Sequence, residues 1–217
     1  MDSRISDPQA RHGEAAFPGL PLRDTARDAL KIVLVGGFGA GKTTMVGSVS
    51  EIRPLSTEEL MTRAGVGIDD AGRLPDKNST TVAFDFGRIT LNAYQVLYLF
   101  GAPGQQRFWF LWDRLFSGTL GAVVLVDTRR LEDSWFAVDR LEHGGMPFIV
   151  AVNRFEAPGA GPEPDLAQIR EALCLSERVP LIDCDARRRE SSKTVLITLV
   201  KYLAHCKKSA AARETAP

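Results

Sequence analysis

Short apolar runs alternate with helical patterns along the central part of the chain. Continuous apolar runs, which suit buried parallel strands, cover residues 29–37, 121–127, 146–153 and 179–186. Helix-favouring stretches lie between and after them, at residues 42–52, 132–143, 165–175 and 190–208. Strands that alternate with helices predict an α/β fold in which helices cover both faces of a mostly parallel sheet.

One region departs from this pattern and predicts an antiparallel pair. Apolar residues alternate with small or polar ones through residues 80–91, "TTVAFDFGRITL", as they do in a half-buried strand. A second apolar strand, residues 93–100, follows within a few positions, so the two strands form a hairpin. The predicted sheet therefore has six strands, one of them antiparallel. Just before the hairpin, "STEELMTRAG", residues 56–65, predicts a short helix with a capping box.

The chain divides into a leader, one domain and a tail. Residues 1–29 are polar and interrupted by prolines, which predicts a disordered leader. Residues 30–206 hold the predicted strands and helices and form the single domain. Residues 207–217 are predicted to be a disordered tail.

Charge and composition narrow the possible classes of function. Lysine plus arginine number 27 and aspartate plus glutamate number 27, so the chain lacks the basic footprint of a general nucleic-acid binder. No apolar run reaches the length of a membrane span, and neither end carries a lipidation signal. Three widely separated cysteines give no zinc spacing and favour a reducing compartment. We expect a cytoplasmic protein without a membrane anchor of its own, which partners recruit to a membrane.

The first predicted strand runs into "GGFGAGKT", which fits the phosphate-binding loop (P-loop) pattern Gly-x-x-x-x-Gly-Lys-Thr. Its glycines let backbone N–H groups curl around a phosphate, Lys42 reaches the β and γ phosphates, and the Thr43 hydroxyl is a magnesium ligand. The pattern predicts a nucleoside triphosphate without specifying the base. The predicted nucleotide-binding residues of this segment are Gly36, Phe38, Gly39, Ala40, Gly41, Lys42, Thr43 and Thr44.

The order of motifs after the P-loop resembles that of the Ras-like small GTPases over residues 30–206. The matching segments are "GGFGAGKTT", "STTVAFDFGRITL", "LFGAPGQQRF" and "AVNRFE". In particular the chain resembles the bacterial GTP-binding proteins of conservon operons, which are related to the polarity GTPases of gliding bacteria. The resemblance implies a P-loop NTPase with a Ras-like G domain that binds GTP or GDP with Mg²⁺ and hydrolyses GTP slowly. It also implies a roadblock-type partner and a sensor-kinase-like membrane protein as partners.

The resemblance assigns roles to residues on two switch segments. Thr81, with Thr80 as the alternative, would bind magnesium and sense the γ-phosphate. The Gly104 N–H would bond the γ-phosphate. Gln105, with Gln106 as the alternative, would orient the attacking water. Gln105 and Lys42 would act in catalysis.

Two further segments resemble those that recognise guanine. Residues 153–156, "NRFE", stand where such proteins carry Asn-Lys-x-Asp. Asn153, Arg154 and Glu156 would read the base, because a carboxylate accepts from the guanine N1–H and 2-amino group, a donor pair that adenine lacks. The plane of Arg154 would lie over the base. In "CDAR", residues 184–187, the Ala186 N–H would contact the guanine oxygen, with Arg187 beside it.

Gly101 departs from the family, because an aspartate that holds the magnesium shell usually stands there. In one interpretation the metal relies on Thr43, Thr81, the phosphates and water. In the other, Asp127 at the end of "AVVLVD" is the true metal-site aspartate, as in P-loop ATPases and kinases. The hairpin favours the first interpretation, in which Asp127 is structural or caps a helix.

Further departures keep other functions open. Phe38 would intrude on the attacking water, which predicts slow hydrolysis, and Arg73 and Arg107 are candidate internal arginines. The alternatives to a GTP switch are a pseudo-GTPase scaffold that binds nucleotide without turnover, and a P-loop ATPase or kinase. Four aromatic residues form either a partner surface or packing of the second switch segment on the core: Phe108, Trp109, Phe110 and Trp112.

Overall fold

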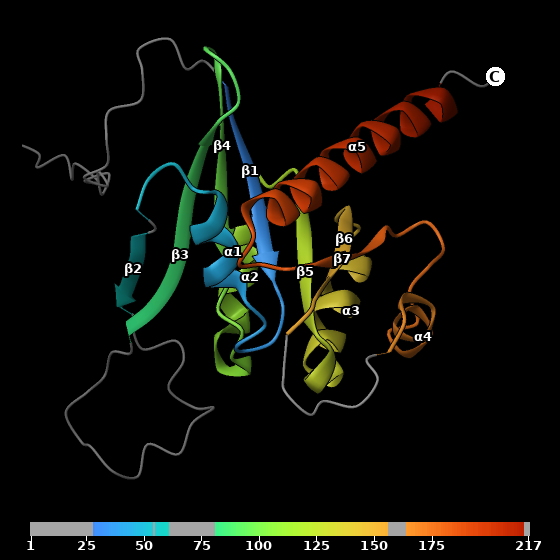
Figure 1. Cartoon of the computed structure of the whole chain (residues 1–217). Coiled ribbons are helices and arrows are strands. Elements are labelled where there is room, and N and C mark those ends of the chain that lie inside the picture. Colours follow the sequence, from blue (N-terminus) through green and yellow to red (C-terminus); the bar gives the residue numbers. More distant parts are fainter. Residues whose placement is uncertain (1–27, 54, 61–80, 156–163, 215–217) are drawn as a thin grey trace, which may run out of the picture.

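The computed structural model describes residues 28–53, 55–60, 81–155 and 164–214 (Figure 1). Its strands are β1 (Asp28–Val35), β2 (Leu55–Leu60), β3 (Thr81–Thr90), β4 (Gln95–Gly101), β5 (Gly121–Asp127), β6 (Phe148–Asn153) and β7 (Leu181–Cys184). Its α-helices are α1 (Lys42–Val49), α2 (Trp112–Phe116), α3 (Trp135–His143), α4 (Leu166–Ala172) and α5 (Arg189–Glu214). Two 3-10 helices are η2 (Gln106–Leu111) and η3 (Thr128–Ser134).

The described strands form one sheet in the order β2-β3-β4-β1-β5-β6-β7. Parallel pairing joins β4, β1, β5, β6 and β7, whereas β3 runs antiparallel to both of its neighbours, β2 and β4. The predicted mostly parallel sheet with a β3–β4 hairpin is therefore confirmed. The same order places β4 and β5 on either side of β1, the strand that leads into the P-loop.

The β2 edge of the sheet corrects one sequence prediction. Residues 55–60 overlap the segment 56–65 that was expected to be helical, yet they pair with β3 from Leu55 opposite Phe86 to Leu60 opposite Thr81. Backbone hydrogen bonding along the open edge of β3 outweighs the local capping signal, because tertiary context overrides propensity. Among the described residues the sheet thus has seven strands rather than the six that were predicted. Residues 61–65 lie outside the described residues.

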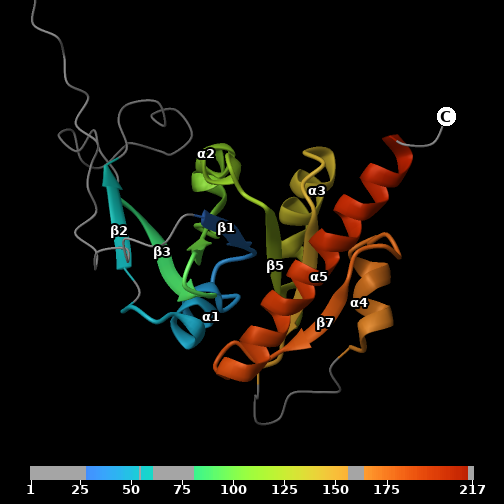
Figure 2. The same ribbon diagram turned by 90° about the horizontal axis from the view of Figure 1, so that it is seen from above.

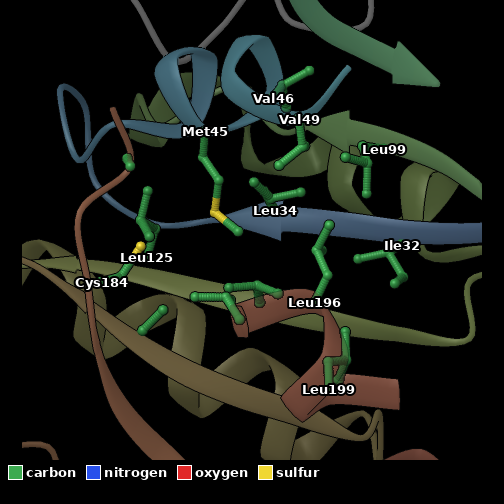
Figure 3. Close-up of a cluster of buried hydrophobic side chains, with 14 of the residues drawn as sticks. Ile32, Leu34, Met45, Val46, Val49, Leu99, Leu125, Cys184, Leu196 and Leu199 are labelled. Carbon is green, nitrogen blue, oxygen red and sulfur yellow. The ribbon is translucent and has the colours of Figure 1, made fainter. Parts of the chain in front are cut away.

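Buried side chains form a core on each face of the sheet. Ile32 and Leu34 of β1 belong to the core under α1 and α5, and Val33 and Val35 belong to the core under α2, α3 and α4. Figure 2 shows α1 and α5 on one side of the sheet, with α2 and α3 on the other. In Figure 3, side chains of α1 and α5 lie on opposite sides of Leu34. Because helices cover both faces, the strand reads as a continuous apolar run.

Helix α5 is longer than the sequence predicted. It continues to Glu214, so the predicted disordered tail was wrong for residues 207–214. Alanine, lysine, arginine and glutamate dominate "KKSAAARE", and these residues have high helix propensity. Within the described ranges, no helix is both long and apolar enough to span a membrane. Strand β1 begins at Asp28, so the predicted leader was wrong for residues 28 and 29. Residues 1–27 and 215–217 lie outside the described residues, and the rest of the leader and the last residues of the tail stay predictions.

The parallel strands bring the functional motifs to one edge of the sheet. Gly36 follows β1, and Gly101, Asp127 and Asn153 are the last residues of β4, β5 and β6. Ligands of open α/β sheets bind in the crevice outside these carboxyl ends. The fold therefore gathers residues that are more than a hundred positions apart in the sequence.

We expect Leu199→Ala to lower the free energy of unfolding by about 2–5 kcal/mol, because it leaves a cavity at a fully buried site where α5 packs on the sheet. Val200→Ala is the matched control on the next position of the same helix. Val200 is 51% exposed, so its truncation changes stability by about 0.5 kcal/mol or less. Urea unfolding followed by circular dichroism measures both. Equal effects would contradict the docking of α5 through Leu199.

Candidate functional site

The P-loop follows a path that only glycine allows at several positions. Gly36, Gly39 and Gly41 have φ angles of 137°, 79° and 103°. A Cβ atom on Gly36 would collide with the Leu125 carbonyl oxygen, and one on Gly41 would lie 2.5 Å from Asn153 Nδ2. The loop packs directly against β5 and β6, and it ends at the N-terminus of α1, where free N–H groups favour an anion.

Lys42 is buried at the base of this loop. Its side chain is 7% exposed, and Nζ donates to the carbonyl oxygens of Gly36 at 2.9 Å and Gly37 at 2.7 Å. Burial lowers the pKa of Lys42 to about 8, although the charges of Asp85 and Asp133 raise it. Among the described residues, no carboxylate forms an ion pair with this buried ammonium group, which is bonded to carbonyl oxygens instead. A phosphate in the loop would supply a counter-charge.

Thr43 and Thr44, the next two residues, are exposed in the first turn of α1. The Thr43 hydroxyl donates to Asp85 Oδ2 at 2.7 Å, and so the predicted magnesium ligand already contacts a carboxylate. Thr81 is the first residue of β3, but its side chain lies outside the described part, as does Thr80. Their predicted metal role stays a prediction.

The segment after β4 lies against the P-loop. A Cβ atom on Gly104 would be 2.6 Å from the Gly37 carbonyl carbon and 2.7 Å from the Phe38 nitrogen. Among the described residues, Gln105 Oε1 is buried without a hydrogen-bond partner. Both residues line an open cavity of about 410 Å³ with Phe38, whose side chain is 62% exposed. The predicted pair Gly104 and Gln105 therefore lies beside the phosphate loop.

The aromatic residues of this segment have divided roles. Phe108 and Trp112 are buried, and Trp112 Nε1 donates to the Pro103 carbonyl oxygen at 3.2 Å. Trp109 stacks on Phe136 of α3 with ring centroids 3.4 Å apart. These three residues pack the segment onto the core. Phe110 is 46% exposed, and its place in a partner surface stays a prediction.

Asn153 joins three segments behind the P-loop. Its Nδ2 donates to the Ala40 carbonyl oxygen at 3.0 Å, and its Oδ1 accepts from the Ala186 N–H at 3.0 Å. In this structure the Ala186 N–H is therefore bonded to Asn153, and its predicted contact with a guanine oxygen stays a prediction. The residue predicted to read the base also fixes the loop after β7 to the P-loop.

The two arginines predicted near the base are held by aspartates. Arg154 Nε donates to Asp183 at 2.7 Å, and its Nη1 donates to the Pro164 carbonyl oxygen at 3.0 Å. Arg187 bonds both carboxylate oxygens of Asp185, at 2.9 and 3.0 Å. These pairs direct both guanidinium groups toward partners in the protein, and the predicted position of Arg154 over a base stays a prediction. Glu156 lies outside the described residues, so its role stays a prediction.

Asp127 has a structural role, as the favoured interpretation predicted. Its carboxylate caps η3 by accepting from the Arg129 N–H at 3.0 Å, and it accepts from Arg129 Nε and Nη2 at 2.8 and 2.7 Å. Burial alone would raise the pKa of Asp127, but the hydrogen bonds and charge of Arg129 lower it below its ordinary value. The Arg129 guanidinium also lies over the Phe155 ring, 3.9 Å from its centroid.

Sequence reasoning missed two residues that contact the P-loop segment. Asp85 of β3 reaches Thr43, and Arg130 of η3 donates to the Phe38 carbonyl oxygen. The single carboxylate within the strand 80–91 was a signal for Asp85, whereas nothing in the sequence marked Arg130. Of the predicted internal arginines, Arg107 is exposed and lies over the Phe108 ring, and Arg73 is outside the described residues.

Comparison with known proteins identifies the family. The sequence model of a family described as "Conserved hypothetical ATP binding protein" matches residues 34–206, most of the chain. The chain belongs to this family. A curated relative, an uncharacterized protein of Methanocaldococcus jannaschii, is 27% identical over 130 residues, which cover 59% of this chain and 71% of that protein.

Solved structures share the fold of this family member. The FeoB G domain of Methanococcus jannaschii aligns with a TM-score of 0.54 at 14% identity, covering 81% of this chain and 98% of that chain. The G domain of the T. maritima FeoB iron transporter aligns with a TM-score of 0.52 at 17% identity, covering 81% and 99%. The P-loop geometry, the family and this fold make the chain a nucleotide-binding P-loop NTPase.

Lys42→Ala should weaken nucleotide binding roughly 10²-fold, because truncating one partner of a buried charge pair costs about 2–5 kcal/mol. Lys201→Ala, which removes an exposed lysine of α5, should leave the affinity unchanged. Titration of a fluorescent nucleoside diphosphate measures both variants. Wild-type affinity in Lys42→Ala would show that the P-loop does not bind the phosphates.

Proposed function

We propose that this protein is a guanine-nucleotide switch that binds GTP with Mg²⁺, hydrolyses it slowly to GDP and signals through its switch segments. The contact of Gly104 with the backbone of Gly37 and Phe38 carries the proposal. A γ-phosphate held by the P-loop would touch this segment, so its loss on hydrolysis would release a contact. The segment would then differ between the two nucleotide states.

The choice of guanine rests on residues 153–156. Asn153, which the resemblance assigns to the guanine-specificity box, is bonded to the P-loop and to the loop after β7. The carboxylate of Glu156 would supply the acceptor for the N1–H and 2-amino groups. The description of the family names ATP, whereas the similar solved structures are G domains, so base preference is the property to measure first.

The alternative functions differ in what they require of Asp127 and of turnover. A P-loop ATPase or kinase that uses Asp127 as its metal-site aspartate would rely on a carboxylate that already accepts three hydrogen bonds from Arg129. A pseudo-GTPase scaffold would bind nucleotide without turnover, and Phe38 beside Gln105 in the cavity is the observation that favours it.

Arg130 is the arginine best placed to assist hydrolysis. It lies on the outer side of the P-loop, where it donates to the Phe38 carbonyl oxygen, and a Cβ atom on Gly39 would be 3.3 Å from its Nη2. Its side chain is 46% exposed, so it can reorient toward a bound phosphate. In this role it would neutralise charge that develops on the phosphates, in place of Arg73 or Arg107.

Partners and location remain part of the proposal. A roadblock-type protein and a sensor-kinase-like membrane protein are the partners that the resemblance to conservon and gliding-motility GTPases implies. The exposed aromatic side chains of Phe38, Phe110 and Trp135 offer apolar contact area for such a partner near the switch segments. We place the protein in the cytoplasm, recruited to a membrane by these partners.

If the protein reads guanine through its 153–156 segment, GTP should bind more tightly than ATP, and Glu156→Ala should reduce that preference about tenfold or more. Glu177→Ala, at an exposed position, is the control for removal of a carboxylate. Calorimetric titration with GTP, GDP, ATP and ADP gives the preference. Tighter binding of ATP by the unmodified chain would refute the guanine assignment.

Arg130→Ala should slow single-turnover GTP hydrolysis roughly 10²-fold, because it removes a positive charge near the phosphates. Arg107→Ala removes an exposed arginine from the neighbouring segment and should not change the rate. Both variants should bind GTP as the unmodified chain does, which separates hydrolysis from binding. Equal rates in the two variants would exclude Arg130 from hydrolysis.

A further inference from the structure

Gly101 leaves a space in the sheet that another side chain fills. Gly101 of β4 lies directly opposite Asp85 of β3 in the antiparallel pair. A Cβ atom on Gly101 would be 2.8 Å from Asp85 Oδ2 and 2.9 Å from Asp85 Cβ. Residues directly opposite one another place their side chains on the same face of a sheet. There is consequently room for one carboxylate between these strands, and Asp85 provides it.

The carboxylate of Asp85 points at the predicted metal ligand. Asp85 Oδ2 accepts a hydrogen bond of 2.7 Å from Thr43 Oγ1, across 42 positions of sequence. It is also one of two carboxylates, with Asp133, whose charge raises the pKa of the buried Lys42. The carboxylate of β3 therefore stands at the point where the P-loop meets α1, the location expected for an aspartate at position 101.

The donor set suits magnesium. A threonine hydroxyl has one proton and two lone pairs, so Thr43 can donate its proton to Asp85 while its oxygen remains available to a cation. Mg²⁺ prefers hard oxygen ligands. In nucleotide sites Mg²⁺ is usually held by one or two protein groups together with phosphates and water. A carboxylate that accepts from a ligating group orients that ligand and increases its affinity for the metal.

We propose that Asp85 replaces the aspartate missing at Gly101 and holds the magnesium of the bound nucleotide through the Thr43 hydroxyl. The inference rests on the proposed binding of nucleotide with Mg²⁺. The carboxylate that positions the metal would then lie on β3, the strand that begins at Thr81, and not on β4. The glycine at 101 is then a requirement of the arrangement, because a second carboxylate would collide with the first.

The test is the dependence of nucleotide release on Mg²⁺. The release rate of mant-labelled GDP is measured at a series of free Mg²⁺ concentrations, with mant-labelled ADP in parallel. The half-effect concentration is the free Mg²⁺ concentration at which Mg²⁺ has slowed release by half of its full effect. For Asp85→Asn we expect a half-effect concentration about 10–100-fold higher than that of the unmodified chain, the usual cost of removing a partner of a metal ligand. Asparagine keeps the shape of the side chain, and a thermal unfolding curve confirms that the variant folds.

Two further variants separate this role from general electrostatics. Asp133→Asn removes the other carboxylate that acts on Lys42, and its half-effect concentration should stay close to that of the unmodified chain. The double variant D85G/G101D moves the carboxylate back to β4, and it should recover Mg²⁺ dependence relative to Asp85→Gly alone. Recovery would support the inference that carboxylates at positions 85 and 101 occupy the same space.

The outcomes are distinguishable. An unchanged half-effect concentration in Asp85→Asn, or equal shifts in Asp85→Asn and Asp133→Asn, would overturn the role of Asp85. If release of both labelled nucleotides from the unmodified chain is independent of Mg²⁺, the metal part of the proposed function fails instead. If only the ADP complex responds to Mg²⁺, the guanine assignment fails while the role of Asp85 is still tested on that nucleotide.

Discussion

Close backbone packing around the P-loop is the constraint on which the rest of the site depends. Gly36 lies against the carbonyl group of Leu125, Gly41 against the amide of Asn153, and Gly104 against the backbone of Gly37. These contacts come from β5, β6 and the segment after β4, so the loop holds its path only if the strands flank β1 in the observed order. A side chain at any of the three glycines would separate elements that must meet.

The same packing explains the electrostatics of the site. Lys42 is buried because the loop closes over it, and burial makes its charge costly unless an anion is near. The protein supplies carbonyl oxygens in direct contact and the carboxylates of Asp85 and Asp133 as nearby opposite charges. A site of this kind gains most from a phosphate, which brings both charge and acceptors. Nucleotide binding thus follows from the fold before any base is specified.

The part of the site that would hold the phosphates is better defined by the structure than the part that would hold the base. Backbone geometry dominates the phosphate half, so family, fold and motif agree there at low sequence identity. The base half depends on a few side chains after β6 and β7. Arg154 and Arg187 are held by aspartates, and the Ala186 N–H is bonded to Asn153. The groups that the sequence pattern assigned to the base therefore have partners within the protein in this structure.

The sequence by itself determined the features that are local in the chain. The apolar runs predicted the strands of the parallel sheet, and "GGFGAGKT" predicted the P-loop, because strand burial and glycine-rich turns depend on neighbouring residues. The hairpin of β3 and β4, which ends at Gly101, was also predicted, since its two strands are adjacent along the chain.

Only the tertiary structure decided which distant groups meet. The pairing of β3 with β4 brought Asp85 into the space above Gly101, and the packing of β3 beside α1 brought its carboxylate to Thr43. Residues 55–60 form a strand because they pair with the edge of β3, although their local sequence predicted a helix. Strand register and sheet order set these contacts, and both depend on pairing between separated segments, which no local pattern of residues encodes.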